Sequence, residues 1–264
     1  MLRLIMFKYK PLIVLCIVVF CALQADAAGD KNLVLYLPFD EGKGAEVKDL
    51  SDNGNHGVIN GDVKWVDGKK NKALEFGGDI GQYVEVADSE SLHFGKEPFA
   101  YMAWVKSNEF GDYQTVITKR HITAGDGNPT ASLFINKTGT IFIEFRDSIQ
   151  GMNAFDATDA VLKENTWYHV VWVKDDSELR VYVDGKLMQK VNHDRKGELT
   201  STEPLRVGVH HYGNTWNDPF IGIIDEVAVF RSALNENDVR QFMNNILPVQ
   251  TLGKLATTWG KLKR

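Results

Sequence analysis

The sequence predicts an all-β chain that folds as a two-sheet antiparallel sandwich with a short C-terminal helix. Short runs of branched and aromatic residues alternate with turn residues over most of the chain, and helical periodicity begins only after Arg231. No Pro/Ser/Gly-rich linker divides the chain near its middle. These observations favour one large β domain over two small ones.

Residues 1–27 have the features of a signal peptide. Basic residues precede an apolar run at 11–23, and Ala25-Asp26-Ala27 follows as a small-x-small cleavage site. A run of about a dozen apolar residues is too short to span a bilayer, which needs roughly 20. We therefore expect a secreted protein, extracellular or periplasmic. The alternative is an uncleaved N-terminal anchor.

Both cysteines, Cys16 and Cys21, lie in this segment, so the mature chain would contain no disulfide. Removing residues 1–27 leaves 27 basic and 34 acidic residues, a formal charge of −7. An acidic surface argues against nucleic acid and anionic membranes as partners.

The strands are expected in order along the chain, starting with the apolar run Leu33–Phe39. Further runs at 73–76, 82–86, 99–106, 114–119 and 133–145 have strand composition. Asn136–Gly139 predicts a hairpin turn inside the last of these runs. Residues 167–174 and 179–183, followed by Asp184-Gly185, predict a double hairpin. Strand 167–174 is apolar on both faces, which places it inside a covered sheet.

The closing strand, within Gly222–Leu234, contains Asp225 and Glu226 among apolar residues. Regular alternation would direct these two side chains to opposite faces. A buried acid must be paired, hydrogen-bonded or bound to a cation. Asp40 and Glu41 raise the same question at the end of the opening strand.

A helix is expected after Asn235, which can act as its cap, with Asp238 as the third helical residue. Val239, Phe242, Met243 and Ile246 follow at helical spacing, and we expect this helix to lie across one end of the sandwich. The domain would then comprise residues 28–247. Residues 248–264 would form a C-terminal tail, either loosely packed or a sorting or docking signal.

Four segments, at 35–57, 68–86, 167–186 and 222–234, occur in an order that resembles laminin-G-like domains of the concanavalin A-like lectin/glucanase superfamily. The first contains the loop Asp49-Leu50-Ser51-Asp52-Asn53-Gly54-Asn55-His56-Gly57. The resemblance implies a jelly roll, in which the last strand returns beside the first and brings Asp40 close to Asp225.

The resemblance also implies a structural calcium ion where the opening strand, this loop and the closing strand meet. Calcium prefers oxygen ligands from carboxylates and amides. The candidate ligands are Asp40, Asp49, Asn53, Asn55 and Asp225. The alternative is that these side chains cap turns and bind backbone amides.

Sugar binding needs aromatic platforms and planar polar side chains in exposed loops. The predicted ligand-binding residues are Tyr113, His210, Tyr212, Trp216 and Asn217. For Trp216, packing against the neighbouring loop is an equal alternative.

No E-x-D-x-E motif, zinc helix or nucleophile elbow is present in the chain. The expected function is a non-catalytic module that binds extracellular carbohydrate. Two alternatives stay open: a module of the cell envelope that binds an extracellular protein or has a structural role, and a glycoside hydrolase with non-standard catalytic carboxylates.

Overall fold

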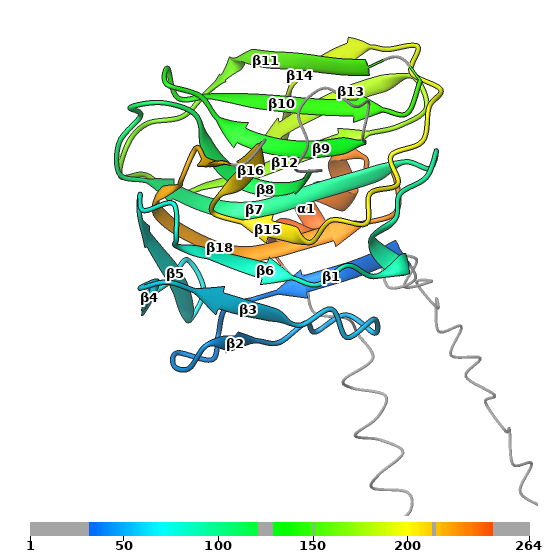
Figure 1. Ribbon diagram of the computed structural model, residues 1–264. Coiled ribbons are helices and arrows are strands. Elements are labelled where there is room, and N and C mark those ends of the chain that lie inside the picture. The colour runs from blue at the N-terminus through cyan, green and yellow to red at the C-terminus, as the bar shows by residue number, and fades with distance from the viewer. Residues whose placement is uncertain (1–31, 121–128, 150, 213–214, 245–264) are drawn as a thin grey trace, which may run out of the picture.

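Two antiparallel sheets face each other in the computed structural model, which describes residues 32–120, 129–149, 151–212 and 215–244 (Figure 1). The first sheet has the order β14 (Lys186–Asn192), β13 (Glu178–Val183), β12 (Tyr168–Lys174), β7 (Phe99–Ser107), β18 (Ile221–Phe230), β5 (Lys72–Gly77) and β4 (Lys64–Asp67), with β1 (Leu33–Leu37) paired to β18. The predicted jelly-roll sandwich is confirmed.

The second sheet has the order β11 (Gly151–Val161), β10 (Thr140–Asp147), β9 (Thr130–Ile135), β8 (Gln114–Arg120), β15 (Leu205–Val207), β6 (Tyr83–Val86), β3 (Gly57–Asn60) and β2 (Glu46–Val47). A separate ribbon pairs β16 (His210–Tyr212) with β17 (Thr215–Asn217). A 3₁₀ turn spans Glu90–Leu92, and the helix α1 spans Glu236–Asn244.

The main core lies between the two sheets and is built by alternation along each strand. Tyr101, Ala103 and Val105 of β7 face Ile143 and its neighbours from the second sheet in one buried cluster. The side chains between them point outward, as a period of two requires.

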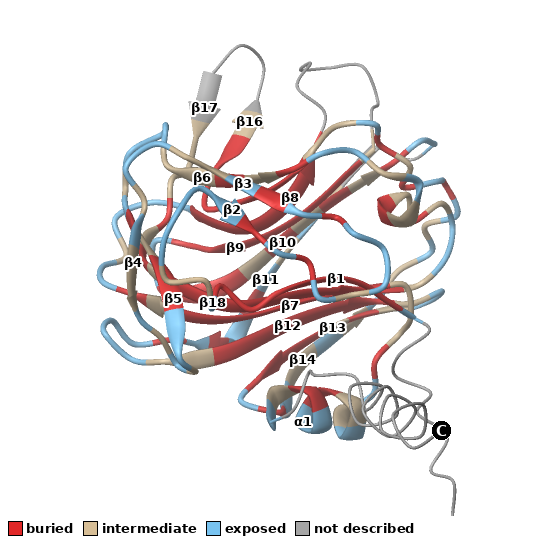
Figure 2. Ribbon diagram, turned by 90° about the horizontal axis from the view of Figure 1, so that it is seen from below, coloured by how far each residue is buried: buried red, intermediate tan, exposed pale blue. Residues whose placement is uncertain are grey.

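The outer face of the first sheet carries a second buried cluster, because α1 packs against it (Figure 2). Val239 and Phe242 of the helix cover Met102 and Phe230, and the rings of Phe230 and Phe242 lie 4.6 Å apart. The prediction that the helix lies across one end of the sandwich was therefore wrong. The apolar stripe of the helix packs against the outward-facing apolar residues of β7 and β18.

The predicted helix start is confirmed in detail. The Asn235 Oδ1 atom accepts hydrogen bonds from the backbone amides of Asn237 (2.8 Å) and Asp238 (3.1 Å). The Asp238 carboxylate in turn accepts the Asn235 amide at 2.9 Å. This reciprocal pair is a capping box, which satisfies amides that have no partner within the helix.

Both predicted hairpin regions are present. β9 and β10 pair across the turn Asn136–Gly139, and β12, β13 and β14 form consecutive antiparallel pairs. Asp184 and Gly185 both have positive φ, at 49° and 77°, as the predicted tight turn requires. β12 lies between β13 and β7 with buried side chains on both faces, which confirms its predicted place inside the sheet.

The opening and closing strands are neighbours, with Leu35 opposite Val229. A β-bulge interrupts β18 between Asp225 and Ala228, and Glu226 has φ 53°. The bulge adds one residue to the strand, so Ile224 and Val227 both face the main core. The expectation that Asp225 and Glu226 point to opposite faces was wrong, because the extra residue breaks the alternation.

The predicted signal peptide and the C-terminal tail beyond residue 247 lie outside the described residues. Within the part of the chain that the structure describes, no helix is long and apolar enough to cross a membrane.

Candidate ligand-binding site

The outer face of the second sheet carries the candidate site, and strand alternation places its side chains there. In β10, Ile141 and Ile143 point into the core. Phe142 and Glu144, at the intervening positions, therefore point outward. Phe134 of β9 lies opposite Phe142 in the strand register.

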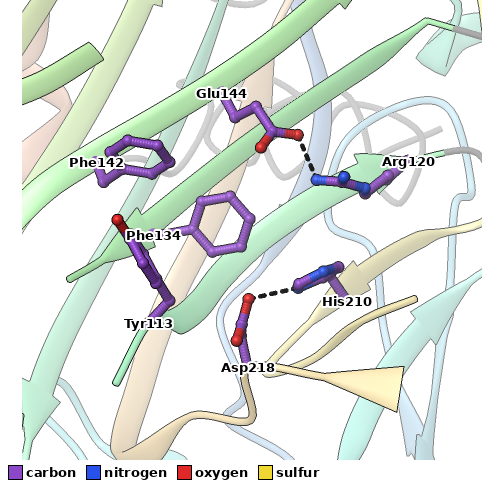
Figure 3. Close-up of a pocket in the computed structure, with 7 residues that line it drawn as sticks. All are labelled: Tyr113, Arg120, Phe134, Phe142, Glu144, His210 and Asp218. Atoms are coloured by element: carbon purple, nitrogen blue, oxygen red, sulfur yellow. Dashed lines mark hydrogen bonds and ion pairs between the residues drawn. The ribbon is translucent and has the colours of Figure 1, made fainter. Parts of the chain in front are cut away.

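These outward residues line a pocket of about 300 Å³, which we call the aromatic pocket (Figure 3). Tyr113 precedes β8, Arg120 ends β8, and His210 and Asp218 come from the ribbon and its exit. The lining residues are Tyr113, Arg120, Phe134, Phe142, Glu144, His210 and Asp218. The sheet thus provides the rigid floor, and the ribbon and the segment before β8 provide walls.

Four rings meet in this pocket with mostly edge-on geometry. The Tyr113 ring lies 5.0 Å from Phe142 and 6.4 Å from Phe134. The His210 imidazole lies 5.5 Å from Phe134, at an interplanar angle of 81°. Because each ring supports its neighbour, the aromatic surface is pre-formed.

Two pairs of polar side chains border these rings. The Arg120 guanidinium binds the Glu144 carboxylate, and His210 Nδ1 lies 3.2 Å from Asp218 Oδ2. Figure 3 shows the two pairs on opposite sides of the Phe134 ring. The pocket therefore offers an apolar centre between two polar edges.

Burial controls the charges at these edges. Burial, followed by the positive charge of Arg120, lowers the pKa of His210 to about 3, so its imidazole is neutral at pH 7. Burial, reinforced by the negative charge of Asp112, raises the pKa of Asp218 to about 6. A neutral imidazole can donate one hydrogen bond to the Asp218 carboxylate. Burial also raises the pKa of Glu144, against the opposing effect of Arg120.

A second pocket of about 320 Å³, which we call the flanking pocket, adjoins the first and shares Tyr113 and Asp218 with it. Its other lining residues are Ile80, Asp112, Gln114, Asn217, Pro219 and Ile221. Both Ile80 and Tyr113 are exposed. The two pockets therefore adjoin at Tyr113 and Asp218, and we call the pair of pockets the depression.

Three of the five predicted ligand-binding residues line this depression. Tyr113 lines both pockets, His210 the aromatic pocket and Asn217 the flanking pocket. The backbones of Tyr212 and Trp216 belong to the ribbon, but their side chains lie outside what the structure describes.

Sequence reasoning missed Arg120, Phe134, Phe142, Glu144 and Asp218. Phe134 lies between Leu133 and Ile135, and Phe142 lies between Ile141 and Ile143, so each ring resembles a core residue within its immediate neighbours. Glu144 and Arg146 were the available signal, because they continue the outward series begun by Phe142.

The candidate metal ligands fall into two groups. In the first, Asp49 accepts the amides of Tyr36 (2.8 Å), Ser51 (2.9 Å) and Asn55 (2.7 Å), and also the Ser51 hydroxyl. Asn53 and Asn55 donate their side-chain amides to the Leu33 and Val34 carbonyls. This loop is thus attached to β1 by direct hydrogen bonds.

In the second group, Asp40 and Asp225 bind adjacent residues of the segment before β5. Asp40 accepts from Asn71 Nδ2 (3.0 Å), and Asp225 Oδ2 accepts from the Lys70 amide (3.0 Å). Burial raises the pKa of Asp225 to about 7. Glu226 accepts from the Tyr36 hydroxyl and from Lys70 Nζ.

These contacts do not form one calcium-coordinating set. Both Asp49 oxygens accept hydrogen bonds from the chain itself, and among the described residues no three His, Cys, Asp or Glu side chains are grouped to hold a metal ion. The capping roles that the sequence left open as an alternative account for the contacts of Asp40, Asp49, Asn53 and Asn55, whereas Asp225 Oδ1 is buried and receives no hydrogen bond from the described residues. The calcium ion stays a prediction.

A laminin-G family model, described as the concanavalin A-like lectin/glucanases superfamily, matches residues 76–240. The match includes the strands of the aromatic pocket, and the opening strand and its loop lie outside it. No curated protein sequence matches the chain.

Solved structures show the same fold at low sequence identity. The binding domain of Paraclostridial Mosquitocidal Protein 1 aligns with TM-score 0.65 and 17% identity, over 82% of this chain and 53% of that one. A structure of botulinum neurotoxin type C, whose cell entry depends on interaction with two ganglioside molecules, aligns with TM-score 0.64 and 14% identity, over 81% of this chain and 51% of that one. The chain thus spans about half the length of these toxin domains.

Domain 4 of AbnA, a GH43 extracellular arabinanase from Geobacillus stearothermophilus, was solved in complex with arabinotriose. It aligns with TM-score 0.62 and 21% identity, over 80% of this chain and 97% of that one. Three observations point to the same family: the sheet order, the pairing of the opening and closing strands, and the match to the family model. The chain belongs to the concanavalin A-like lectin/glucanase superfamily.

Proposed function

We propose that the protein is an exported, non-catalytic module that binds extracellular carbohydrate at the aromatic pocket. The observation that carries this proposal is the outward-facing pair of rings Tyr113 and Phe142, which pack on the buried Phe134 ring and are bordered by the Arg120–Glu144 and His210–Asp218 pairs. Aromatic rings offer surface to the C–H faces of a sugar, and polar edges can hydrogen-bond its hydroxyl groups. The pocket combines both kinds of contact.

Two structures of similar fold support this proposal, because the arabinanase domain was solved in complex with arabinotriose and the type C neurotoxin interacts with ganglioside molecules. Their low identity to this chain means that the sugar itself must be found by measurement. The basic and apolar features of residues 1–27 support export.

Hydrolysis is the alternative function of this pocket. A glycosidase needs one carboxylic acid as a proton donor and a second carboxylate as a base or nucleophile. Asp218, whose pKa burial raises to about 6, has the chemistry of a proton donor, but Glu144, the other carboxylate of the aromatic pocket, is bound by Arg120, which supports a binding role.

The test is binding of the mature protein to a panel of soluble polysaccharides and oligosaccharides, measured by calorimetry. Phe142→Ala and Tyr113→Ala should each weaken binding at least tenfold, while the variants stay folded at the temperature of the measurement despite the ring contacts that they lose. Leu187→Ala is the matched control, because Leu187 is an exposed apolar residue on β14 of the other sheet. Equal binding by wild type and both pocket variants would refute the assignment.

The same samples test catalysis. Reducing ends should not accumulate when the wild-type protein is incubated with any glycan that it binds. Release of reducing ends that Glu144→Gln or Asp218→Asn abolishes would establish hydrolysis instead.

A further inference from the structure

The two pockets on this face share a wall, and this arrangement limits the size of the ligand. Tyr113 and Asp218 line both, while Phe142 belongs only to the aromatic pocket and Ile80 only to the flanking pocket. Each pocket, at about 300 Å³, is at the small end of the range for small-molecule sites. A ligand that uses both must have at least two linked units that meet at Tyr113.

The flanking pocket has the chemistry of a second sugar subsite. Ile80, Pro219 and Ile221 provide apolar surface, and Asp112 and Asn217 provide polar groups. The Ile80 side chain is 49% exposed, so it offers accessible apolar surface within this pocket. The Tyr113 ring could contact a unit on either side of it.

The charges that line the two pockets are unbalanced. Among the described residues that line them, Asp112, Asp218 and Glu144 contribute carboxylates, and Arg120 contributes one guanidinium. Arg120 is buried and already binds Glu144, so its charge is largely compensated. Arg146, next along β10, also acts on Glu144. A sugar carboxylate or sulfate in either pocket would face Asp218 at close range.

From these two observations we propose that the ligand is a neutral oligosaccharide of at least two units that lies across Tyr113 and occupies both pockets. This inference rests on the proposed carbohydrate-binding function and adds the length and charge of the ligand. Sugars with carboxylate or sulfate groups are disfavoured.

Length is tested by calorimetry with neutral arabino-, xylo-, cello- and galacto-oligosaccharides of one to five units. For the series that binds, affinity should rise at least tenfold from the monosaccharide to the trisaccharide and then level off. Ile80→Ala should weaken trisaccharide binding by about tenfold, because it removes apolar contact from the flanking pocket. It should leave monosaccharide binding unchanged.

Charge is tested with matched pairs, lactose against sialyllactose and galacto-oligosaccharides against their galacturonate counterparts. Each acidic member should bind at least tenfold more weakly than its neutral partner, and Asp112→Asn should narrow that difference. Leu187→Ala again serves as the control for both tests.

The outcomes separate this inference from the proposed function. A monosaccharide that binds as tightly as the trisaccharide would overturn the two-pocket ligand and leave carbohydrate binding intact. Acidic sugars that bind as tightly as neutral ones would overturn the charge preference alone. Absence of binding to every sugar, neutral and acidic, would overturn both.

Discussion

Replacing Asp49 by alanine should destabilise the fold more than any other change in the loop that follows β2. The Asp49 carboxylate accepts three backbone amides, and two of them, from Tyr36 and Asn55, are buried. In Asp49→Ala these buried amides lose their acceptor. Leaving a buried donor unsatisfied costs about 1–3 kcal/mol, so the two together predict a loss of about 2–6 kcal/mol.

A loss of this size is a large part of the total stability of a domain, typically about 5–15 kcal/mol. It can be measured by urea unfolding followed by tryptophan fluorescence, and each variant is compared with wild type at constant m-value. Asp49→Asn should lose less, because it keeps one acceptor oxygen. Asp52→Ala is the control, since Asp52 is an exposed residue of the same loop.

Performing the experiment in calcium and in chelator separates the two roles of Asp49. A backbone acceptor predicts the same loss in both solutions, whereas a calcium ligand predicts a loss only in calcium. A change below about 0.5 kcal/mol, within the range of ordinary surface substitutions, would refute the hydrogen-bond reasoning. The calcium hypothesis predicts that Asp225→Ala lowers stability in calcium and has much less effect in chelator, and equal losses in both would refute it.

Three further predictions follow from backbone geometry, capping and burial. Gly222→Ala should destabilise the fold by at least about 3 kcal/mol in urea unfolding, because a Cβ atom would lie 2.2 Å from the Lys106 carbonyl oxygen. Gly44→Ala is the control: its Cβ would meet no heavy atom within 4 Å, so it should cost only the roughly 1–2 kcal/mol of a positive φ. Equal losses in the two variants would refute the clash. Asn235→Ala should cost about 1 kcal/mol through loss of the cap, and an unchanged urea midpoint would contradict that role. Burial raises the pKa of Asp218 to about 6, so its ionised form destabilises the fold above pH 6 and this penalty disappears as the pH falls towards 4. Asp218→Asn should therefore be more stable than wild type at pH 7.5, by on the order of 1 kcal/mol, and should lose that advantage at pH 4; no difference between the two pH values would contradict the shift.

The sequence was sufficient to predict the features that depend on local chemistry. A few adjacent residues determine each of these features, which are the turns at Asn136–Gly139 and Asp184-Gly185 and the capping box of Asn235 and Asp238. The pairing of β1 with β18 followed from the jelly-roll resemblance, which supplies long-range order that local patterns lack.

The features that the sequence did not predict depend on local exceptions or on distant contacts. One extra residue at Glu226 changed the direction of its side chain, and alternation alone cannot reveal a bulge. The pocket was missed in part because Phe134 and Phe142 resemble core residues, and their place on the outer face of the second sheet depends on which face of that sheet is covered. The Arg120–Glu144 pair joins two strands separated in sequence by β9, so spacing gave no signal for it.

The position of β18 also determines when the domain can fold. β18 pairs with β1, β5 and β7, so these three strands cannot complete their pairing until β18, the last strand of the chain, has been synthesised. At roughly 5–20 residues per second, synthesis separates Leu35 from its partner Val229 by on the order of 10–40 s. During that time the strand with which β1 pairs in the folded protein has not yet been made, whereas β8, β9, β10 and β11 can each pair with the strand next to them in sequence. Assembly of the first sheet is therefore expected to be post-translational and slow, because its contacts are long-range.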